Sequence, residues 1–278
     1  MRLNNLRRSS NVNDRRGSGV ALAGGGGGVF VLALIVYLMG GDPTGLIVNG
    51  VSQMSQRSTL SPEQEAKQKD FVAAVLGNTE DVWGEIFRAH GSSYRQPVLT
   101  LFAGAVDSAC GRAGAAMGPF YCPMDQRVYL DLSFFNDLER RFAAPGDFAR
   151  AYVIAHEVGH HIQNLEGTFD RVQARQQRSS DSAARALSVR VELQADCYAG
   201  VWANRAQAQF GAIEPGDIDE ALNAATQIGD DRLQQQSQGH VVPDAFTHGT
   251  SEQRSRWFNT GFKAGQIEAC DTFGAGKI

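Results

Sequence analysis

The stretch Ala155-His156-Glu157-Val158-Gly159-His160-His161 contains the pattern His-Glu-x-x-His. On a helix, His156 and His160 project from one face, one turn apart, at a separation that suits two nitrogen ligands of a single Zn²⁺ ion. Glu157 lies about 100° around the helix from His156, where it can reach a water molecule on the metal without being a ligand. Because the metal lowers the pKa of that water and a carboxylate can take its proton, the pattern predicts a zinc hydrolase with Glu157 as the general base and then the acid.

A helix is expected around this pattern. Asp147 is a favourable N-cap residue, and Gly167 is a favourable residue to end the helix. Between them, apolar residues recur at spacings of three and four, the period of an amphipathic helix: Phe148, Ala151, Tyr152, Ala155, Val158 and Ile162. Gly159 lies in the middle, where glycine is unfavourable. A small residue there indicates close packing against a neighbouring helix.

Two histidines are too few for a catalytic zinc, which usually has three protein ligands and one open position. Glu192, which lies 32 residues after His160 on a separate helix, is the preferred third ligand. Asp196 shares its helical face and is predicted to accept a hydrogen bond from the second nitrogen of a ligand histidine. Glu166 occupies the position of a third histidine in another zinc-hydrolase pattern and is the less favoured alternative. In the alternative interpretation, Glu192 and Asp196 bind no metal and only form an acidic helix face that pairs with nearby arginines.

The charge of the chain is unevenly distributed. Residues 1–16 contain five arginines and one aspartate, a net charge of +4, which leaves −8 for the other 262 of the 278 residues, given the total of −4. A mildly acidic body argues against nucleic acid as a partner. The length suffices for one substantial domain and an appendage.

Four cysteines are present without a Cys-x-x-Cys pair, which argues against a thiolate zinc site. The even number fits two disulfides in an oxidising compartment. Cys110 and Cys122 enclose a short Gly/Ala-rich loop and form the natural pair, which leaves Cys197 with Cys270. The sequence alone permits three connectivities.

The N-terminal part predicts attachment to a membrane. Residues 1–16 are polar and Arg-rich, and we expect them to form a disordered, basic cytoplasmic tail. Residues 17–41 carry no charge, and their mostly apolar positions match the thickness of a bilayer, so we expect one transmembrane helix there. Residues 42–60 would be a linker. The arginines place the N-terminus in the cytoplasm and the remaining domain, 61–278, on the extracytoplasmic (periplasmic) side of the cell membrane. A cleaved signal peptide and a flexible glycine linker are the alternatives.

Domain 61–278 is predicted to be α+β and predominantly helical. Helices are expected at 62–76, 80–88, 147–166, 182–209, 217–235 and 250–262. Two stretches rich in β-branched and aromatic residues, 97–103 and 127–132, predict a small antiparallel sheet. An edge strand of that sheet would either hold an extended substrate by strand addition or merely cover the core.

Four segments resemble the bacterial "putative neutral zinc metallopeptidase" family, which is of the gluzincin type. They are residues 118–123, 156–163, 192–197, and 247–254 together with 257–258. The resemblance extends over nearly the whole chain and includes the N-terminal Arg-rich and hydrophobic stretches. It implies a zincin-like, zinc-dependent metallopeptidase that acts on peptide or protein substrates. In this interpretation His156, His160 and Glu192 hold the metal.

His248, in the last of these segments, is a candidate for stabilising the oxyanion formed when a peptide carbonyl is attacked. Tyr129 and His240 are rival candidates, and a purely structural role at the start of the last helix is the alternative for His248. His161 points away from the metal-binding face, so a structural role is expected. His90 has no evident metal role.

These patterns favour a membrane-anchored zinc endopeptidase. The alternative is a non-catalytic, metal-stabilised and membrane-tethered module that binds a protein partner. A structural zinc in such a module would favour a site closed by four protein ligands. A general base at Glu157 would have no role in that site. No pattern marks the natural substrate or the oligomeric state.

Overall fold

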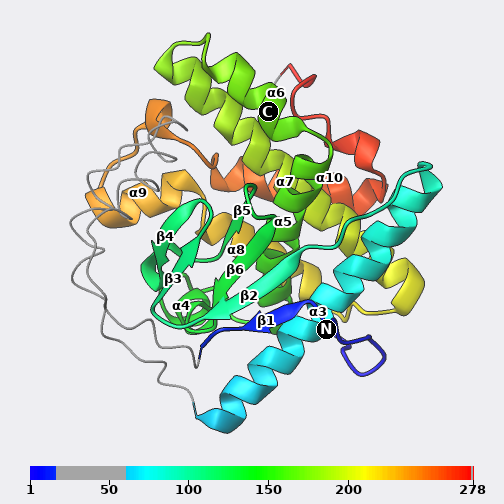
Figure 1. The fold of residues 1–278 in the computed structure, drawn as a ribbon. Coiled ribbons are helices and arrows are strands. Elements are labelled where there is room, and N and C mark those ends of the chain that lie inside the picture. Colours follow the sequence, from blue (N-terminus) through cyan, green and yellow to red (C-terminus); the bar gives the residue numbers. More distant parts are fainter. Residues whose placement is uncertain (17–60, 277) are drawn as a thin grey trace.

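Helices make up most of the part of the chain that this computed structural model describes, which comprises residues 1–16, 61–276 and 278 (Figure 1). The elements in chain order are β1 (Val12–Asp14), α3 (Pro62–Ala89), β2 (Val98–Phe102), β3 (Ala105–Ser108), β4 (Gly111–Gly114), η1 (Ala115–Met117), β5 (Phe120–Cys122), β6 (Arg127–Asp131), α4 (Phe134–Arg140), α5 (Asp147–Leu165), α6 (Thr168–Gln176), α7 (Asp181–Phe210), α8 (Asp217–Gln227), α9 (Asp230–Gln238), η2 (Pro243–Ala245), α10 (Ser251–Ala264) and η3 (Ile267–Cys270). The prediction of a mostly helical α+β fold is confirmed.

Four short strands form a mixed sheet in the order β1-β2-β6-β5, next to the two-stranded hairpin β3–β4 (Figure 1). Strands β2 and β6 are parallel, with Thr100 opposite Tyr129, whereas β5 is antiparallel to β6. The expectation of an antiparallel sheet built from these two stretches is therefore wrong in orientation. The turn at 123–126 places β5 beside β6 as its antiparallel neighbour. The connection that leaves β2 first forms the separate β3–β4 hairpin, and β6 then returns parallel to β2.

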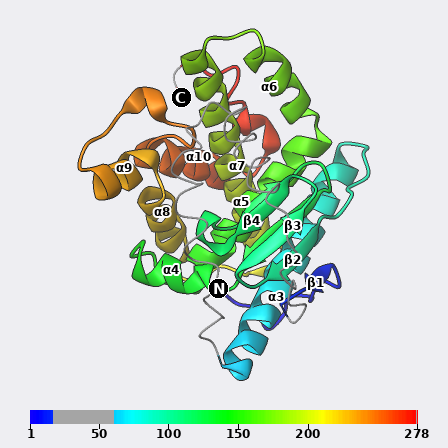
Figure 2. The same ribbon diagram turned by 60° about the vertical axis from the view of Figure 1, so that its left-hand side comes forward.

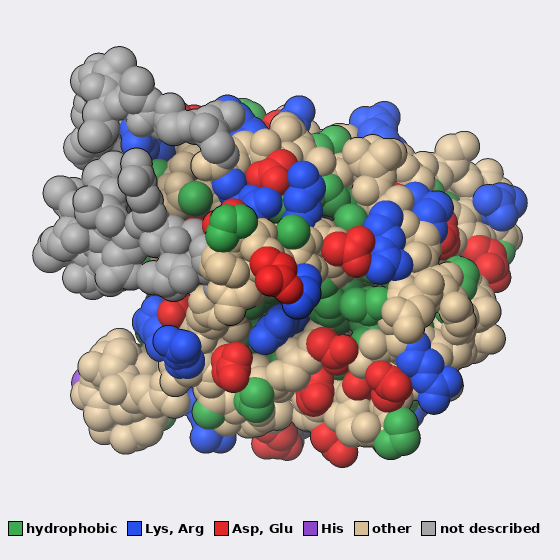
Figure 3. Space-filling view, turned by 90° about the horizontal axis from the view of Figure 1, so that it is seen from below, with side chains coloured by type: hydrophobic (Ala, Val, Ile, Leu, Met, Phe, Trp, Pro, Cys, Tyr) green, Lys and Arg blue, Asp and Glu red, His purple; other side chains and the backbone are tan. Residues whose placement is uncertain are grey.

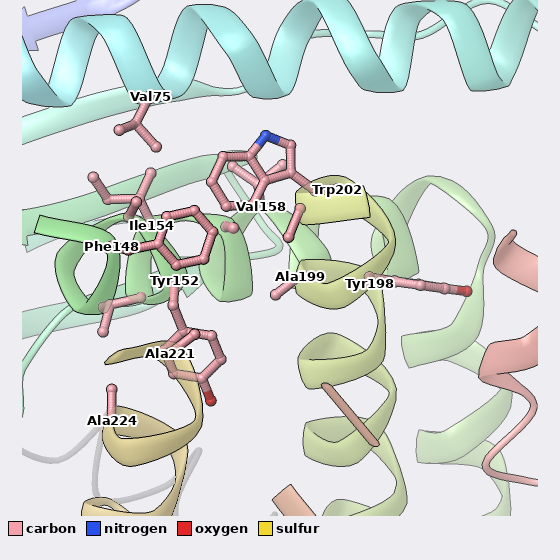
Figure 4. Packing of buried hydrophobic residues seen from close by; sticks show 14 of the residues in the cluster. Val75, Phe148, Tyr152, Ile154, Val158, Tyr198, Ala199, Trp202, Ala221 and Ala224 are labelled. Atoms are coloured by element: carbon pink, nitrogen blue, oxygen red, sulfur yellow. The ribbon is translucent and has the colours of Figure 1, made fainter. Parts of the chain in front are cut away.

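The core lies around α5, which packs against the sheet on one side and near α8 on the other (Figure 2). Apolar side chains from α3, α5, α7 and α8 meet there, as Figure 4 shows for Val75, Phe148, Tyr152, Ile154, Val158, Ala199, Trp202, Ala221 and Ala224. The few polar residues buried on α5 are therefore costly unless they have a partner or a function. They are His156, Glu157, His161 and Gln163.

The N-terminal arginines belong to the folded unit. Strand β1 pairs in parallel with β2, and the chain before it runs along α3. Arg7 binds Glu80 at 2.7 Å and Asp81 at 2.9 Å, and Arg8 binds Asp70 at 2.7 Å. The prediction of a disordered basic tail is therefore wrong, because acidic residues of α3 neutralise charges that look unpaired in the sequence.

The start of the chain is also fixed in place. Met1 is 7% exposed, and its ammonium group lies 2.9 Å from Asp147, 3.1 Å from Glu214 and 3.3 Å from Asp217. A Cβ atom at Gly77 of α3 would collide with the backbone of the N-terminal segment, so glycine permits this crossing. On the face shown in Figure 3, basic and acidic side chains are interspersed, and neither gathers into one large patch.

The predicted transmembrane helix 17–41 and linker 42–60 lie outside the described residues. Among the helices that are described, none is long and apolar enough to span a bilayer.

Several helix boundaries differ from expectation. Helix α3 is continuous through Asn78 and Thr79, although two separate helices are expected from the sequence, at 62–76 and 80–88. The Thr79 hydroxyl instead donates to the Leu76 carbonyl, and Asn78 Oδ1 accepts from the Trp202 indole. The single helix expected at 217–235 is divided into α8 and α9. Capping boxes begin both α3, at Ser61 and Gln64, and α10, at Thr250 and Gln253.

Both predicted disulfides are confirmed. Cys110–Cys122 joins the β3–β4 hairpin to β5 within a small apolar cluster. Cys197–Cys270 joins α7 to η3 in the C-terminal segment, across a sequence separation of 73 residues.

Candidate metal centre

Helices α5 and α7 approach each other closely at Gly159. A Cβ atom there would lie 2.9 Å from the Ala195 carbonyl oxygen and 3.1 Å from the Ala195 Cα. The absent side chain therefore brings the histidine face of α5 directly against the acidic face of α7. The prediction that the mid-helix glycine serves close packing is confirmed.

The three predicted metal ligands converge at this crossing. His156 Nε2 lies 3.2 Å from Glu192 Oε2, and His160 Nε2 lies 3.6 Å from Glu192 Oε1. The two imidazole centroids are 4.7 Å apart. One ligand atom from each of the three residues lies within 4.8 Å of the others. Such a set of two histidines and a carboxylate is typical of catalytic zinc sites.

The other nitrogen of each histidine has an oxygen partner. His156 Nδ1 lies 2.8 Å from Asp196 Oδ1, and His160 Nδ1 lies 2.8 Å from Gln163 Oε1. With Nδ1 engaged, each ring directs Nε2 toward Glu192, as metal-binding histidines require. The residues present therefore fit a zinc ion. Asp196 has the contact expected of it, whereas Gln163 was missed, although its spacing of three from His160 places it on the same face.

Asp196 is completely buried and accepts four hydrogen bonds. Besides His156, its donors are the Tyr152 hydroxyl at 2.6 Å and Arg254, through Nε at 2.8 Å and Nη2 at 3.0 Å. Burial disfavours the charged carboxylate, but the positive charges of Arg254 and His156 lower the pKa of Asp196 to about 2. Asp196 is thus held ionised as the acceptor for His156. The sequence offered no chemical reason to single out Arg254 or Tyr152.

Glu157 lies in the same buried region and is 8% exposed. Burial raises the pKa of its carboxyl group, against the lowering effect of His160 and His156. Among the described residues its side chain has no hydrogen-bond or ion-pair partner. A buried carboxylate free of protein partners beside a metal site is suited to proton transfer.

His248 lies in a loop that packs beside Glu192. Its Nδ1 is 3.2 Å from Asp230 Oδ1, and the backbone N–H groups of residues 247–249 all donate to Asp230 Oδ2. The loop is fitted against α7, since a Cβ atom at Gly249 would lie 3.2 Å from a Leu193 methyl group. The His248 side chain is 52% exposed, and Asp230 and the charge of Glu192 raise its pKa. The role of Asp230 in holding this loop was missed.

The rival candidates are engaged elsewhere. Glu166 accepts a hydrogen bond from the Tyr198 hydroxyl at 2.7 Å and is not part of the ligand group. The Tyr129 hydroxyl donates to Asp125 at 2.7 Å. His240 is exposed in the loop that follows α9.

His161 of α5 and His90, which caps the C-terminal end of α3, have structural contacts. His161 Nε2 donates to the Arg95 carbonyl at 2.6 Å, so its Nδ1 accepts from the Tyr121 hydroxyl at 3.0 Å. Burial lowers the pKa of His161, which keeps it neutral. These contacts fasten β5 to α5. His90 pairs with Glu268 at 3.0 Å, away from the ligand group.

Comparison with known proteins gives consistent results. A family model described as "Putative neutral zinc metallopeptidase" matches residues 1–273. YpfJ of Escherichia coli strain K12, named an uncharacterized protein, is 49% identical over 286 residues, which cover 99% of each chain. Rv2575 of Mycobacterium tuberculosis strain H37Rv, also named uncharacterized, is 40% identical over 262 residues, which cover 87% of this chain and 86% of the relative. The comparison with solved structures found no match.

Proposed function

Because the chain belongs to the "putative neutral zinc metallopeptidase" family, we propose that it is a zinc-dependent endopeptidase whose metal is held by His156, His160 and Glu192. One observation carries this proposal. The two Nε2 atoms and the carboxylate converge, and both Nδ1 atoms are engaged by acceptors. Glu157 lies beside them and has no side-chain partner among the described residues.

A zinc ion at this site would polarise a peptide carbonyl and lower the pKa of a water molecule. Glu157 would take the proton of the attacking water and deliver it to the leaving nitrogen, for which a raised pKa is favourable. Asp196 would hold His156 in the orientation needed for binding. His248, which Asp230 fixes in its loop, would donate a hydrogen bond to the oxyanion.

The substrate would be an extended peptide laid along β5. This strand is at the edge of the sheet, and its only strand partner among the described residues is β6. Tyr121 of β5 contacts His161 and Asn164 of α5, next to the ligand histidines. An edge strand held in this way can bind a peptide through backbone hydrogen bonds.

A non-catalytic, metal-stabilised binding module has less support. A structural zinc site is normally closed by four protein ligands. The ligand group found in the described part of the chain has three members, and Glu157 beside it has no structural partner. The two disulfides support an oxidising, extracytoplasmic compartment for the catalytic unit.

The test is the metal content of the full chain, purified in detergent without added metal and measured by mass spectrometry. The full chain is needed because residues 1–16 are part of the fold. We expect about one zinc per chain, lost in Glu192→Ala. Glu268→Ala is the matched control, because this glutamate is 64% exposed and outside the site. Absence of zinc from the folded wild-type chain would contradict the proposal.

Glu157→Gln tests the catalytic role. The variant should retain the zinc, because Glu157 is not a ligand, and lose hydrolysis of unfolded protein substrates by roughly 10²- to 10⁴-fold, the usual contribution of a general base. The measurement is turnover at equal zinc content. Undiminished turnover in this variant would exclude Glu157 as the base.

A further inference from the structure

Gln163 is a buried amide that joins the candidate metal centre to α7. It is fully buried, lies three residues after His160, and places Oε1 2.8 Å from His160 Nδ1. Burial of an amide is unfavourable unless its donor and acceptor atoms are all used. The partners of its nitrogen therefore show what the side chain does.

Hydrogen bonds on the far side fix which end of the amide faces the histidine. Gln163 Nε2 donates to the Val191 carbonyl at 2.7 Å and to Gln194 Oε1 at 3.1 Å. A backbone carbonyl can only accept, so the amide nitrogen must face α7 and the amide oxygen must face His160. That oxygen also only accepts. His160 therefore carries a hydrogen on Nδ1, and Nε2, which faces Glu192, is the nitrogen left to bind a metal.

A second amide, that of Gln194, continues the series of hydrogen bonds in the same direction into the C-terminal segment. Gln194 Nε2 donates to the backbone carbonyl of Cys270 at 3.1 Å, so its Oε1 must face the first amide. Cys270 is held over α7 by its disulfide with Cys197. The hydroxyl of Thr272 adds a hydrogen bond to the Arg190 carbonyl at 2.7 Å.

We propose that Gln163 and Gln194 are positioning residues for His160, and that the carbonyls of Val191 and Cys270 set the direction of this hydrogen-bond relay. The inference rests on the proposed function. Three hydrogen bonds in series select the tautomer whose Nε2 can bind zinc, and they fix the plane of the ring. The other ligand histidine is oriented by a carboxylate. The amide relay orients the second one without burying a further negative charge.

The experiment compares the zinc affinity of the full-chain variants Gln163→Leu and Gln194→Met, by competition with a chromophoric chelator. The visible spectrum of the Co²⁺-substituted protein reports the ligand geometry independently of activity. We expect Gln163→Leu to weaken zinc binding by about 10- to 100-fold, Gln194→Met to weaken it by a smaller factor, and both to change the Co²⁺ bands. The matched control is Gln176→Leu, which removes another amide between helices, bonded to the Ala184 carbonyl at 3.1 Å.

Wild-type affinity together with an unchanged Co²⁺ spectrum in both variants would overturn the relay and leave the proposed function standing. A folded wild-type chain without zinc would overturn the proposed function itself. If Gln163→Leu does not fold, Gln194→Met decides alone, because among the described residues its side chain is hydrogen-bonded to Gln163 and Cys270 and not to His160. Weaker zinc binding with altered Co²⁺ bands in this variant then supports the relay, and an unchanged zinc affinity with an unchanged Co²⁺ spectrum overturns it.

Discussion

Asp196 and Arg254 form a buried ion pair behind the candidate metal centre. Arg254 is 3% exposed and Asp196 is fully buried, and two hydrogen bonds of 2.8 and 3.0 Å join them. Such a pair contributes little over an apolar replacement of both groups, but removal of one partner leaves a charge buried without compensation. The pair thus serves to hold a charge in place beside His156, at a cost that the rest of the core offsets.

Arg254→Met should therefore destabilise the metal-free protein by about 3–5 kcal/mol, the cost of an uncompensated buried charge. The measurement is the free energy of unfolding in urea. The double variant Asp196→Asn/Arg254→Met should be less destabilised than the sum of the two single variants, because the two residues share one interaction. Simple additivity would contradict the inferred pairing.

At the scale of single residues, the sequence predicts those functional residues that are separated by a characteristic number of positions. The four-residue interval between the ligand histidines, and between Glu192 and Asp196, requires only that each segment be helical. Arg254 could not be found in this way, because it is 58 residues from Asp196 and meets it only through helix packing. Tyr152 is in phase with His156, but a tyrosine at that position fits an apolar core equally well.

Helices α7 and α10 cross at two glycines. A Cβ atom at Gly200 would collide with the Phe258 carbonyl, and one at Gly261 would collide with the Cys197 carbonyl. Each helix thus presents its backbone to the other. This close crossing lets Arg254, on α10, reach Asp196, on α7.

Gly261→Ala should destabilise the protein by about 1–3 kcal/mol or more, because the added methyl group forces the helices apart. Gly84→Ala is the matched control, since a Cβ atom there would meet nothing within 4 Å. That change should stabilise helix α3 by up to about 1 kcal/mol. Thermal unfolding of both variants gives the comparison, and equal effects would argue against the close crossing.

The loop that carries His248 is fixed to α9 by Asp230. Hydrogen bonds from His248 and from backbone N–H groups lower the pKa of Asp230 against the effect of burial. A carboxylate with a lowered pKa stabilises the fold above its ordinary pKa of about 3.9 and loses that contribution as the pH falls through the lower value of the folded state.

Asp230→Asn should therefore be less stable than the wild type at pH 6, by about 1–3 kcal/mol. The difference should narrow as the pH falls below about 4, because the wild-type carboxylate then becomes protonated. Urea unfolding across this pH range measures it. A constant difference would show that the charge of Asp230 does not hold the loop.

Element positions follow from the sequence better than their pairing does. Periodicity locates α5, α7, β2 and β6 to within a few residues, because each has a buried face. The parallel orientation of β2 and β6 is set by where β5 lies, which no local pattern encodes. Likewise α3 continues through Asn78 because the Trp202 indole, from a distant helix, occupies its side-chain oxygen.

At the scale of the molecule, the first 16 residues complete the fold. They add a strand to the sheet, pair Arg7 and Arg8 with α3, and place Met1 among three carboxylates. The sequence suggested disorder because the partners of these arginines, such as Asp70 and Glu80, lie more than 60 residues away. A run of like charge predicts a disordered tail only where no opposite charge packs against it.

The pairing of β1 with β2 restricts how the chain can be threaded through a membrane. A segment that crosses a bilayer once leaves its two ends about 30 Å apart, in different compartments. Residues 12–14 and 99–101 are hydrogen-bonded neighbours, so they share one compartment. A single crossing between these two segments, as the sequence predicts, would instead place the N-terminus and the catalytic domain in different compartments.

Single introduced cysteines can test whether the two segments share one compartment, because all four native cysteines are paired in disulfides. Arg2 and Glu63 are 63% and 77% exposed, on opposite sides of the hydrophobic stretch. We expect Arg2→Cys and Glu63→Cys to react equally with a membrane-impermeant maleimide on intact spheroplasts. Labelling of Glu63→Cys alone would show that β1 and β2 are separated in the cell. Equal labelling would mean that the N-terminus lies beside the catalytic domain, on the same side of the membrane.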